Sequence, residues 1–427
     1  MANEWREASL GELTDWASGG TPPKENPEYW GGNIPWISAS SMKSGRLSDS
    51  DRTLTMKGLE QRSKLARKND ILLLVRGSEL HKRIPVGIAT RDVAFNQDVK
   101  SLRPKNGLSS TYLYYWLAAH ESMLLSKVEH TGIGAGKLDT AVLKNLRVQV
   151  PPIEAQRAIA HILSTLDDKI ELNRRRNQTL EDMVRALFKD WFVDFGPVRT
   201  KIEGQEPYLP EEIWRLFPER LDEEGKPVGW EEKPLDEIAE FLNGLPLQKF
   251  PATDPGDSIP VIKIAELRNG VSAKSDRASR DVPAKHIIKD GDFLFSWSGS
   301  LLAKFWTEGD GALNQHLFKV SSDQFPMWFV SHWVHHHLVD FQTIAASKAT
   351  TMGHIQRGHL TAAKTVCPPA RVLLSMGVTM APLVEQAIKN EIESRTLADL
   401  RDTLLPKLIS GDLRLPEAMV QVDAAKT

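Results

Sequence analysis

The stretch PPIEAQRAIAHILSTLDDKIELNRRRNQTLEDMVRALFKDWF, residues 151–192, decides the fold. After its opening Pro-Pro pair it contains no glycine or proline, and apolar residues recur along it at alternating spacings of four and three. This is the heptad pattern of a coiled coil, in which one face of a long helix packs against a partner helix. We therefore expect a long helix over residues 151–195. Its seam comprises Ile159, Leu163, Leu166, Ile170, Asn173, Asn177, Leu180, Val184, Leu187 and Trp191.

A second seam follows 217 residues later, after another Pro-Pro pair, and predicts a helix over residues 368–412. Both seams have a polar centre, where a buried asparagine fixes the register of a coiled coil at a cost in stability. Two such seams in one chain most simply pair with each other, in either direction. Pro382 and Pro406 of the second helix have no counterparts in the first helix, and they should kink or shorten the second helix. The second seam comprises Met376, Met380, Leu383, Ala387, Asn390, Ser394, Leu397, Arg401, Leu404 and Leu408.

Three arginines, residues 174–176, lie beside the polar centre of the first helix, where the second helix has Glu391, Ile392 and Glu393. Ion pairs between the helices, contact with DNA or with another subunit, and plain solvation are all compatible with this pattern.

The repeat extends upstream, so the whole chain is a duplication. Trp5-Arg6-Glu7 corresponds to Trp230-Glu231-Glu232, and Asn96-Gln97 corresponds to Asn314-Gln315. Each copy begins with short apolar runs separated by Gly, Pro, Ser and Asn, which predict strands and loops in a globular head. The expected segments are heads over 1–150 and 229–367, helices over 151–195 and 368–412, an acidic Pro- and Gly-containing linker over 196–228, and a flexible tail over 413–427.

Composition indicates a soluble, multidomain, cytoplasmic protein. The 427 residues are 41% hydrophobic, and we find neither an apolar run long enough for a membrane span nor a signal peptide. The single cysteine, Cys367, excludes an internal disulfide and a cysteine-based zinc site. Net charge is only −2, yet residues 1–150 carry 21 Lys and Arg against 16 Asp and Glu. This local basic excess allows a DNA-facing surface.

Several motifs in fixed order, two of them in the helices, carry a resemblance to a known family. They are the run over 151–192, LLPKLISGDLRL over 404–415, and the opening over 10–37 with Ser18-Gly19-Gly20-Thr21-Pro22 and Gly32-Asn33-Ile34-Pro35-Trp36-Ile37. Over nearly its whole length the chain resembles the specificity subunits of type I restriction-modification systems. The second copy departs from the pattern, because Asn243-Gly244-Leu245-Pro246 replaces the Ser-Gly-Gly-Thr-Pro loop.

The resemblance implies an α+β fold with two mixed α/β target-recognition domains, each followed by a long helix. The two helices would pair as an antiparallel coiled coil with pseudo-two-fold symmetry. It further implies a non-catalytic subunit of a phage-defence complex that reads a bipartite, asymmetric site in double-stranded DNA, one half-site per head. Helices of this length, roughly 50 Å, would set the gap between the half-sites.

The implied partners are two methyltransferase subunits, which modify adenine, and endonuclease/translocase subunits for cleavage. S-adenosylmethionine, ATP and magnesium would bind to those partners, and this chain would bind no cofactor and no metal.

DNA contacts need side chains that reach base edges or phosphates, so candidates come from polar and basic residues in predicted loops. The first head offers Thr21, Lys24, Ser38, Ser40, Lys43, Arg76, Ser78, Lys82, Arg83 and Lys137. The second head offers Gln248, Lys249, Lys263, Arg268, Ser298, Ser300, Lys304, Lys348 and Arg357.

Short enzyme-like patterns carry little weight. The glycine-rich run over 131–137 lacks the first glycine and the Ser/Thr of a nucleotide-binding loop. The histidines at 332 and 335–337 lie among apolar residues typical of a packing helix, with no accompanying carboxylate motif. Two alternatives remain: a coiled-coil scaffold whose heads bind protein instead of DNA, and a modification enzyme that itself binds S-adenosylmethionine.

Overall fold

The computed structural model describes residues 5–131, 134–347 and 353–425, and it divides into two compact units. The first unit combines residues 1–169 with 397–427, and the second is the continuous segment 170–396. The long helices α6 (Ile153–Phe188) and α13 (Ala370–Ser410) each pass from one unit to the other. Each unit thus contains one head and a portion of both helices. This division differs from the predicted one, which separated heads from helices, because helix side chains pack into the cores of the heads.

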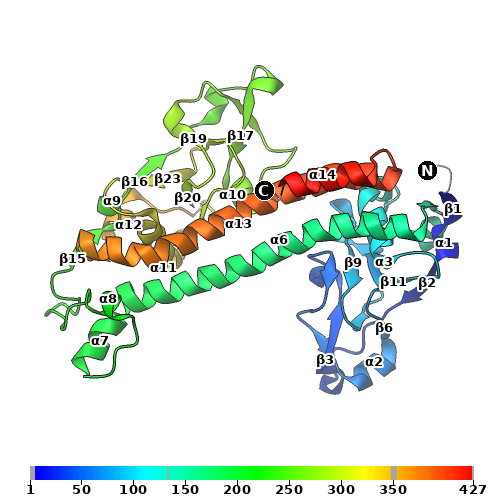
Figure 1. Ribbon diagram of the computed structural model, residues 1–427, viewed down its shortest axis with the longest axis horizontal. Coiled ribbons are helices and arrows are strands. Elements are labelled where there is room, and N and C mark those ends of the chain that lie inside the picture. The colour runs from blue at the N-terminus through cyan, green and yellow to red at the C-terminus, as the bar shows by residue number, and fades with distance from the viewer. Residues whose placement is uncertain (1–4, 132–133, 348–352, 426–427) are drawn as a thin grey trace. The chain divides into compact units, whose positions relative to one another are not determined.

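The head of the first unit is built on two sheets. A five-stranded sheet has the order β2 (Thr14–Ser18), β11 (Val99–Pro104), β7 (Ile71–Leu74), β9 (Val86–Ala89), β4 (Arg46–Leu47). A four-stranded sheet has the order β5 (Thr53–Leu54), β3 (Trp30–Ile37), β10 (Val93–Phe95), β6 (Lys64–Ala66). Figure 1 shows helix α3 (Ser110–Ala119) beside α6, and the Tyr115 hydroxyl donates a 2.6 Å hydrogen bond to Asp167 of α6.

The head of the second unit repeats this topology. One sheet has the order β16 (Glu240–Asn243), β23 (Leu317–Ser321), β20 (Phe293–Ser296), β21 (Ala303–Phe305). The other has the order β18 (Arg277–Ser279), β17 (Ser258–Ile262), β22 (Gly311–Leu313), β19 (Ile287–Ile288). In both heads the second sheet contains one parallel pair, β3 with β10 and β17 with β22. The shared strand order confirms the duplication, and the mixture of sheets and helices confirms the predicted fold class.

Within each unit the two long helices run antiparallel. In the second unit Asn173 donates to the Ser394 hydroxyl at 3.3 Å, while Asn177, one turn further along α6, donates to the earlier Ala387 carbonyl at 2.9 Å. In the first unit Asp167 of α6 accepts from Arg401 of α13. Most of the predicted seam is buried, including Leu163, Leu166, Val184, Met376, Met380, Leu404 and Leu408.

The polar centre of the seam forms a reciprocal network. Asn390 donates to the Asn177 Oδ1 at 2.8 Å, and Asn173 donates to the Ser394 hydroxyl. A shift of 217 residues carries Asn173 onto Asn390 and Asn177 onto Ser394, so the duplication exchanges these two hydrogen bonds. The polar centres of the two helices therefore meet across the pair, as the sequence predicted, although the buried Asn173 Oδ1 accepts no hydrogen bond from the described residues.

The prolines were expected to kink or shorten the second helix, and the shortening is not observed. Helix α13 continues through Pro382 and Pro406 and, at 41 residues, is longer than the 36-residue α6. Pro382 leaves the carbonyl of Val378 without its usual helical donor. Pro382 and Val378 are both exposed, so a water molecule can donate to the Val378 carbonyl instead.

Two of the three arginines at the polar centre form ion pairs within α6. Arg174 and Arg175 bind Glu171 at 2.9 and 2.7 Å, at spacings of three and four residues. These pairs hold the pKa of Glu171 down to about 2, chiefly through the Arg174 hydrogen bond. The ion pairs of these two arginines therefore join successive turns of one helix.

Two segments expected to be loosely structured are folded. The linker contains α7 (Gly196–Ile202) and α8 (Glu211–Trp214), which follow the end of α6 (Figure 1), and its Val198 and Phe217 are buried in the second unit's core. Where a flexible tail was expected, residues Leu415–Ala425 form α14, with Ala418 and Val422 buried. Apolar residues one turn apart give this short helix a face that packs.

Candidate nucleic-acid interface

Three strand ends meet at one edge of the five-stranded sheet in the first head. The last residue of β2, Ser18, pairs with Lys100 at the start of β11, and Val99 pairs with Leu74 at the end of β7. The loops that follow or precede these strands therefore converge, and we call this region the first strand-end edge. It carries Ser18, Thr21, Arg76, Gln97 and Lys100.

Hydrogen bonds organise the polar side chains of this edge. The Thr21 hydroxyl donates to Gln97 Oε1 at 2.6 Å, and Lys100 Nζ donates to the Ser18 hydroxyl at 2.6 Å. Desolvation lowers the pKa of Lys100, opposed by the charge of Asp98. Amide, hydroxyl and ammonium groups of this kind suit contacts with base edges and phosphates.

The glycines of the first loop are required by close packing. A side chain at Gly19 would place its Cβ 2.0 Å from the Phe95 carbonyl oxygen, and one at Gly20 would lie 1.9 Å from the carbonyl oxygen of Arg62. No other residue fits there without movement of the backbone. The glycine pair therefore brings the loop against β10 and holds Thr21 at the edge.

The second head forms the equivalent edge with a different set of side chains. Trp297 Nε1 donates at 3.1 Å both to Asn243 Oδ1 and to the carbonyl of Gln315. Ser298 and His316 share a 3.0 Å hydrogen bond, and Ser298 pairs with His354 in an isolated bridge. We call this region the second strand-end edge.

The loop that departs from the family pattern retains its essential glycine. A Cβ at Gly244, which corresponds to Gly19, would lie 2.1 Å from the Asn314 carbonyl oxygen. Position 245, which corresponds to Gly20, holds leucine, and Leu245 forms a parallel bridge with Asn314. The backbone of the loop is thus similar in the two heads, whereas the side chains available for contact differ.

The predicted DNA-binding residues of the first head fall into three groups. Thr21 and Arg76 belong to the first strand-end edge, Lys137 pairs with Arg76 in a small sheet, and Ser78 begins a 3-10 turn two residues after Arg76. Lys24, Ser38 and Ser40 line a recess of about 500 Å³ beside Arg52. Lys43, Lys82 and Arg83 lie elsewhere, and Arg83 donates to the Met42 carbonyl at 2.8 Å, which secures a turn.

In the second head the predicted residues are more scattered. Ser298 belongs to the second strand-end edge, and Arg357 donates to the Phe241 carbonyl at 3.2 Å while lying over the Phe318 ring. Gln248 and Lys249 lie in a 3-10 turn, and Lys263 forms an ion pair with Asp276. Arg268 lies in the last turn of α10 (Ile264–Asn269). The carbonyl of Ser300 accepts a hydrogen bond from the Ser296 hydroxyl. Lys304 lines a recess between α6, α11 (Met327–Ser347) and α13. Lys348 lies outside the described residues.

Sequence reasoning missed Gln97, Lys100, Asn243, Gln315 and His316 as candidates. A usable signal existed, because Asn96-Gln97 and Asn314-Gln315 correspond in the two copies. Once β11 and β23 are located, that correspondence identifies the polar residues immediately before each strand as candidates.

The described residues contain no cluster of side chains typical of a metal centre. No group of three or more His, Cys, Asp or Glu side chains within them is arranged to hold a metal ion. None of the helices in this part of the chain combines the length and apolar character needed to cross a bilayer.

Comparisons with known proteins agree with this architecture. Residues 2–182 match the model of the type I restriction modification DNA specificity domain. The chain is 29% identical to the type I restriction enzyme MjaIX specificity subunit of Methanocaldococcus jannaschii, over 98% of this chain and 95% of that protein. It is 26% identical to the HindI specificity subunit of Haemophilus influenzae, over 64% of this chain and 70% of that protein.

The fold is shared with a solved structure of the same kind. The crystal structure of a type I restriction-modification S subunit from M. genitalium superposes with a TM-score of 0.56 at 17% identity, over 96% of this chain and 97% of that one. The family model, the nearly full-length relative and the shared fold agree with the duplicated heads and antiparallel helices, and over nearly its whole length the chain is similar to the specificity subunits of type I restriction-modification systems.

Proposed function

We propose that this subunit reads a bipartite, asymmetric DNA site, with one half-site contacted by each strand-end edge. The observation that carries the proposal is that each head presents the same convergence of strand ends with different hydrogen-bonding groups. Gln97 and Gln315 occupy corresponding positions, but the first edge adds Lys100 and the second adds His316. Different donor and acceptor sets recognise different bases, so two such edges specify two unlike half-sites.

Direct readout at the first edge assigns roles by side-chain chemistry. Gln97 is suited to adenine, whose N6 and N7 match an amide, and Arg76 is suited to guanine O6 and N7 or to a phosphate. Arg76 is exposed at the edge and available for such a contact. Lys100 is a point charge for the phosphate backbone and contributes affinity without sequence preference.

The helix pair is proposed to set the gap between the half-sites and to dock the catalytic partners. These partners are two methyltransferase subunits, with endonuclease/translocase subunits added for cleavage. S-adenosylmethionine, ATP and magnesium are proposed to bind to the partners. Support comes from the full-length similarity to a type I restriction enzyme subunit, since such an enzyme needs both activities.

The test is to co-express the chain with its methyltransferase partner in a host without DNA adenine methylation, and to map modified bases by long-read sequencing. The expected result is one two-part motif with a fixed gap. Gln97→Ala is expected to relax the motif in one half only, and Gln315→Ala in the other half only. Lys57→Ala, on an exposed lysine of α2 (Met56–Arg62), is the matched control and should leave the motif intact.

Unmodified DNA from a stable complex with active methyltransferase would overturn the proposal. It would favour a scaffold whose heads bind protein. Titration with salt separates the two, because phosphate contacts make affinity fall steeply with ionic strength.

A further inference from the structure

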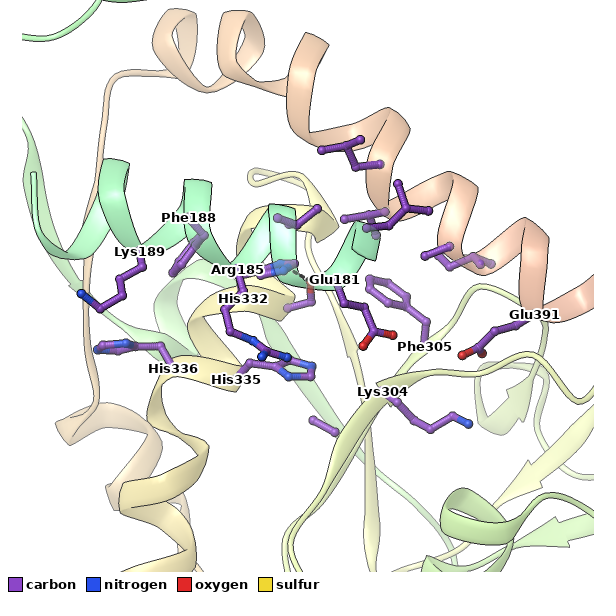
Figure 2. Close-up of a pocket in the computed structure, with 18 of the residues that line it drawn as sticks. Glu181, Arg185, Phe188, Lys189, Lys304, Phe305, His332, His335, His336 and Glu391 are labelled. Carbon is purple, nitrogen blue, oxygen red and sulfur yellow. Dashed lines mark hydrogen bonds between the residues drawn. The ribbon is translucent and has the colours of Figure 1, made fainter. Parts of the chain in front are cut away.

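The second unit contains a recess of about 550 Å³ that the DNA-reading function does not use. Figure 2 shows side chains entering it from α6, α11, α13 and β21. Its volume falls within the range of small-molecule sites in proteins, roughly 300–1,000 Å³. Its apolar wall includes Val184, Phe188, Phe305, Leu383, Val384 and Ile388.

Two positions that line the recess carry smaller residues than their counterparts in the first copy, whereas His335 and Phe188 are larger than their counterparts Ala118 and Leu405. The 217-residue shift that relates the helices also carries α3 onto α11, as the buried Trp116 and Trp333 show. It carries the large Tyr114 onto Ser331, and Ile170 onto Ala387. Ser331 and Ala387 both line the recess.

The corresponding place in the first unit is filled with polar contacts. There the Tyr115 hydroxyl donates to Asp167, and Asp167 accepts from Arg401. In the second unit the equivalent positions hold His332, Val384 and Val184. The recess is therefore specific to the second copy and is not a general consequence of the fold.

Uncharged hydrogen-bonding groups face the recess at neutral pH. Desolvation lowers the pKa of His332 and of His335 to about 4, so both imidazoles are neutral and each offers one donor and one acceptor. Desolvation, with repulsion from Glu391, also raises the pKa of Glu181. Figure 2 shows Glu181 and Arg185 extending from α6 toward the side where His335 lies.

Charges of both signs line the recess. Arg185, Lys189 and Lys304 are cationic, whereas Glu181 and Glu391 are acidic. Neither a strongly anionic nor a strongly cationic ligand is favoured by this mixture. The aromatic rings of Phe188 and His332, whose centroids are 5.4 Å apart, provide a surface for stacking.

From these observations we propose that the recess binds an uncharged, planar nitrogen heterocycle of the purine or benzimidazole class. The ring stacks against Phe188 and His332, and its nitrogen edge exchanges hydrogen bonds with His335 and Glu181. Because the walls come from the second head and from both helices, a bound ligand stabilises the packing of that head within its unit.

The test uses the purified full-length chain without DNA or partners, so its outcome is independent of the proposed DNA recognition. Adenine and benzimidazole are the probes, and binding is measured by saturation-transfer NMR and by the shift in the thermal unfolding midpoint. We expect both probes to bind and to raise the midpoint. Ser331→Tyr and Ala387→Ile restore the larger residues of the first copy, and each should weaken binding by about tenfold or more.

His335→Ala keeps the experiment decisive if a filling variant does not fold, because this residue is exposed at the surface of the recess. This substitution should weaken the binding of adenine more than the binding of naphthalene, because naphthalene has no hydrogen-bonding edge. Val339→Ala, on an exposed residue of α11 away from the recess, is the control and should bind as the wild type does. Absence of binding at millimolar probe, or binding unchanged in Ser331→Tyr, Ala387→Ile and His335→Ala, would overturn the proposal.

Discussion

Asp167 Oδ1 accepts a 2.7 Å hydrogen bond from Arg401 Nη1, and the two positions that correspond to them in the second unit hold Val384 and Val184. The duplication has thus produced an ion pair in one unit and an apolar pair in the other. Asp167 also accepts from Tyr115, which ties α3 to both helices in the first unit. Both partners of the ion pair are mostly shielded, with side-chain exposures of 21% and 28%.

Arg401→Ala is expected to destabilise the first unit by about 2 kcal/mol, because it leaves the shielded Asp167 carboxylate without its cation. Equilibrium urea unfolding of the full chain measures the change. The double variant Asp167→Val with Arg401→Val installs the pair found in the second unit. Its free energy of unfolding should fall by less than that of Arg401→Ala alone. A double variant that is less stable than the single one would contradict this account.

Asn390→Ala should cost about 1–3 kcal/mol, because it leaves Asn177 Oδ1 without its donor. A double-mutant cycle with Asn177→Ala should give a coupling energy of about 0.5–3 kcal/mol, as for residues in direct contact. Both values come from urea unfolding curves. Additive effects of the two substitutions would show that the polar centre is not a network.

Arg76→Ala at the first strand-end edge should weaken binding to DNA and reduce the slope of log affinity against log salt by about 1 if Arg76 contacts a phosphate. A contact with guanine would instead relax one position of the motif at a cost of about 1–3 kcal/mol. Fluorescence anisotropy at several salt concentrations, with the assembled methyltransferase complex, distinguishes the two. Unchanged affinity and unchanged specificity would remove Arg76 from the interface.

Acid should destabilise the second unit between pH 6.5 and about 4. The pKa of His332 is lowered by desolvation from 6.5 to about 4 in the folded chain. As the pH falls through this window the unfolded chain binds more protons at this position than the folded one, so stability falls, and the histidine contribution to that fall is complete near pH 4. Unfolding midpoints at pH 7 and 5 test this, and the His332→Gln variant should show a smaller difference. An equal pH dependence in the variant would refute the assignment.

Lengthening the helix pair should widen the gap between half-sites. Seven residues inserted into each helix beside the polar centre preserve the heptad and add about 10 Å, or roughly 3 base pairs. Methylome mapping gives the gap directly. An unchanged gap in a folded, active variant would exclude the helix pair as the spacer.

The coiled-coil seam could be predicted because its signal is local. Each seam residue from Ile159 to Trp191 lies three or four positions from the next seam residue, and such a period can be recognised without knowledge of distant contacts. The two prolines misled the prediction, because their effect depends on whether water can reach the carbonyl left unpaired. Exposure of Val378 decides that, and exposure is a tertiary property.

The strand-end edges could be predicted only in part, because they join residues that are remote in sequence. Thr21 meets Gln97 across 76 positions, and Trp297 meets Asn243 across 54. Loop composition identified Thr21 and Arg76, but nothing local distinguishes them from Lys43 or Lys82. The register of β2, β11 and β7 makes that distinction.

The division of the chain into units has a consequence for synthesis on the ribosome. The second unit is one uninterrupted segment and has all its residues once position 396 has emerged. The first unit needs residues 397–427 as well as the N-terminal head, and a Cβ at Gly411 would lie 3.3 Å from the ring of Trp5. The head translated first is therefore the one completed last, and the surface against which Leu404 and Leu408 pack stays uncovered until residues 397–427 have emerged.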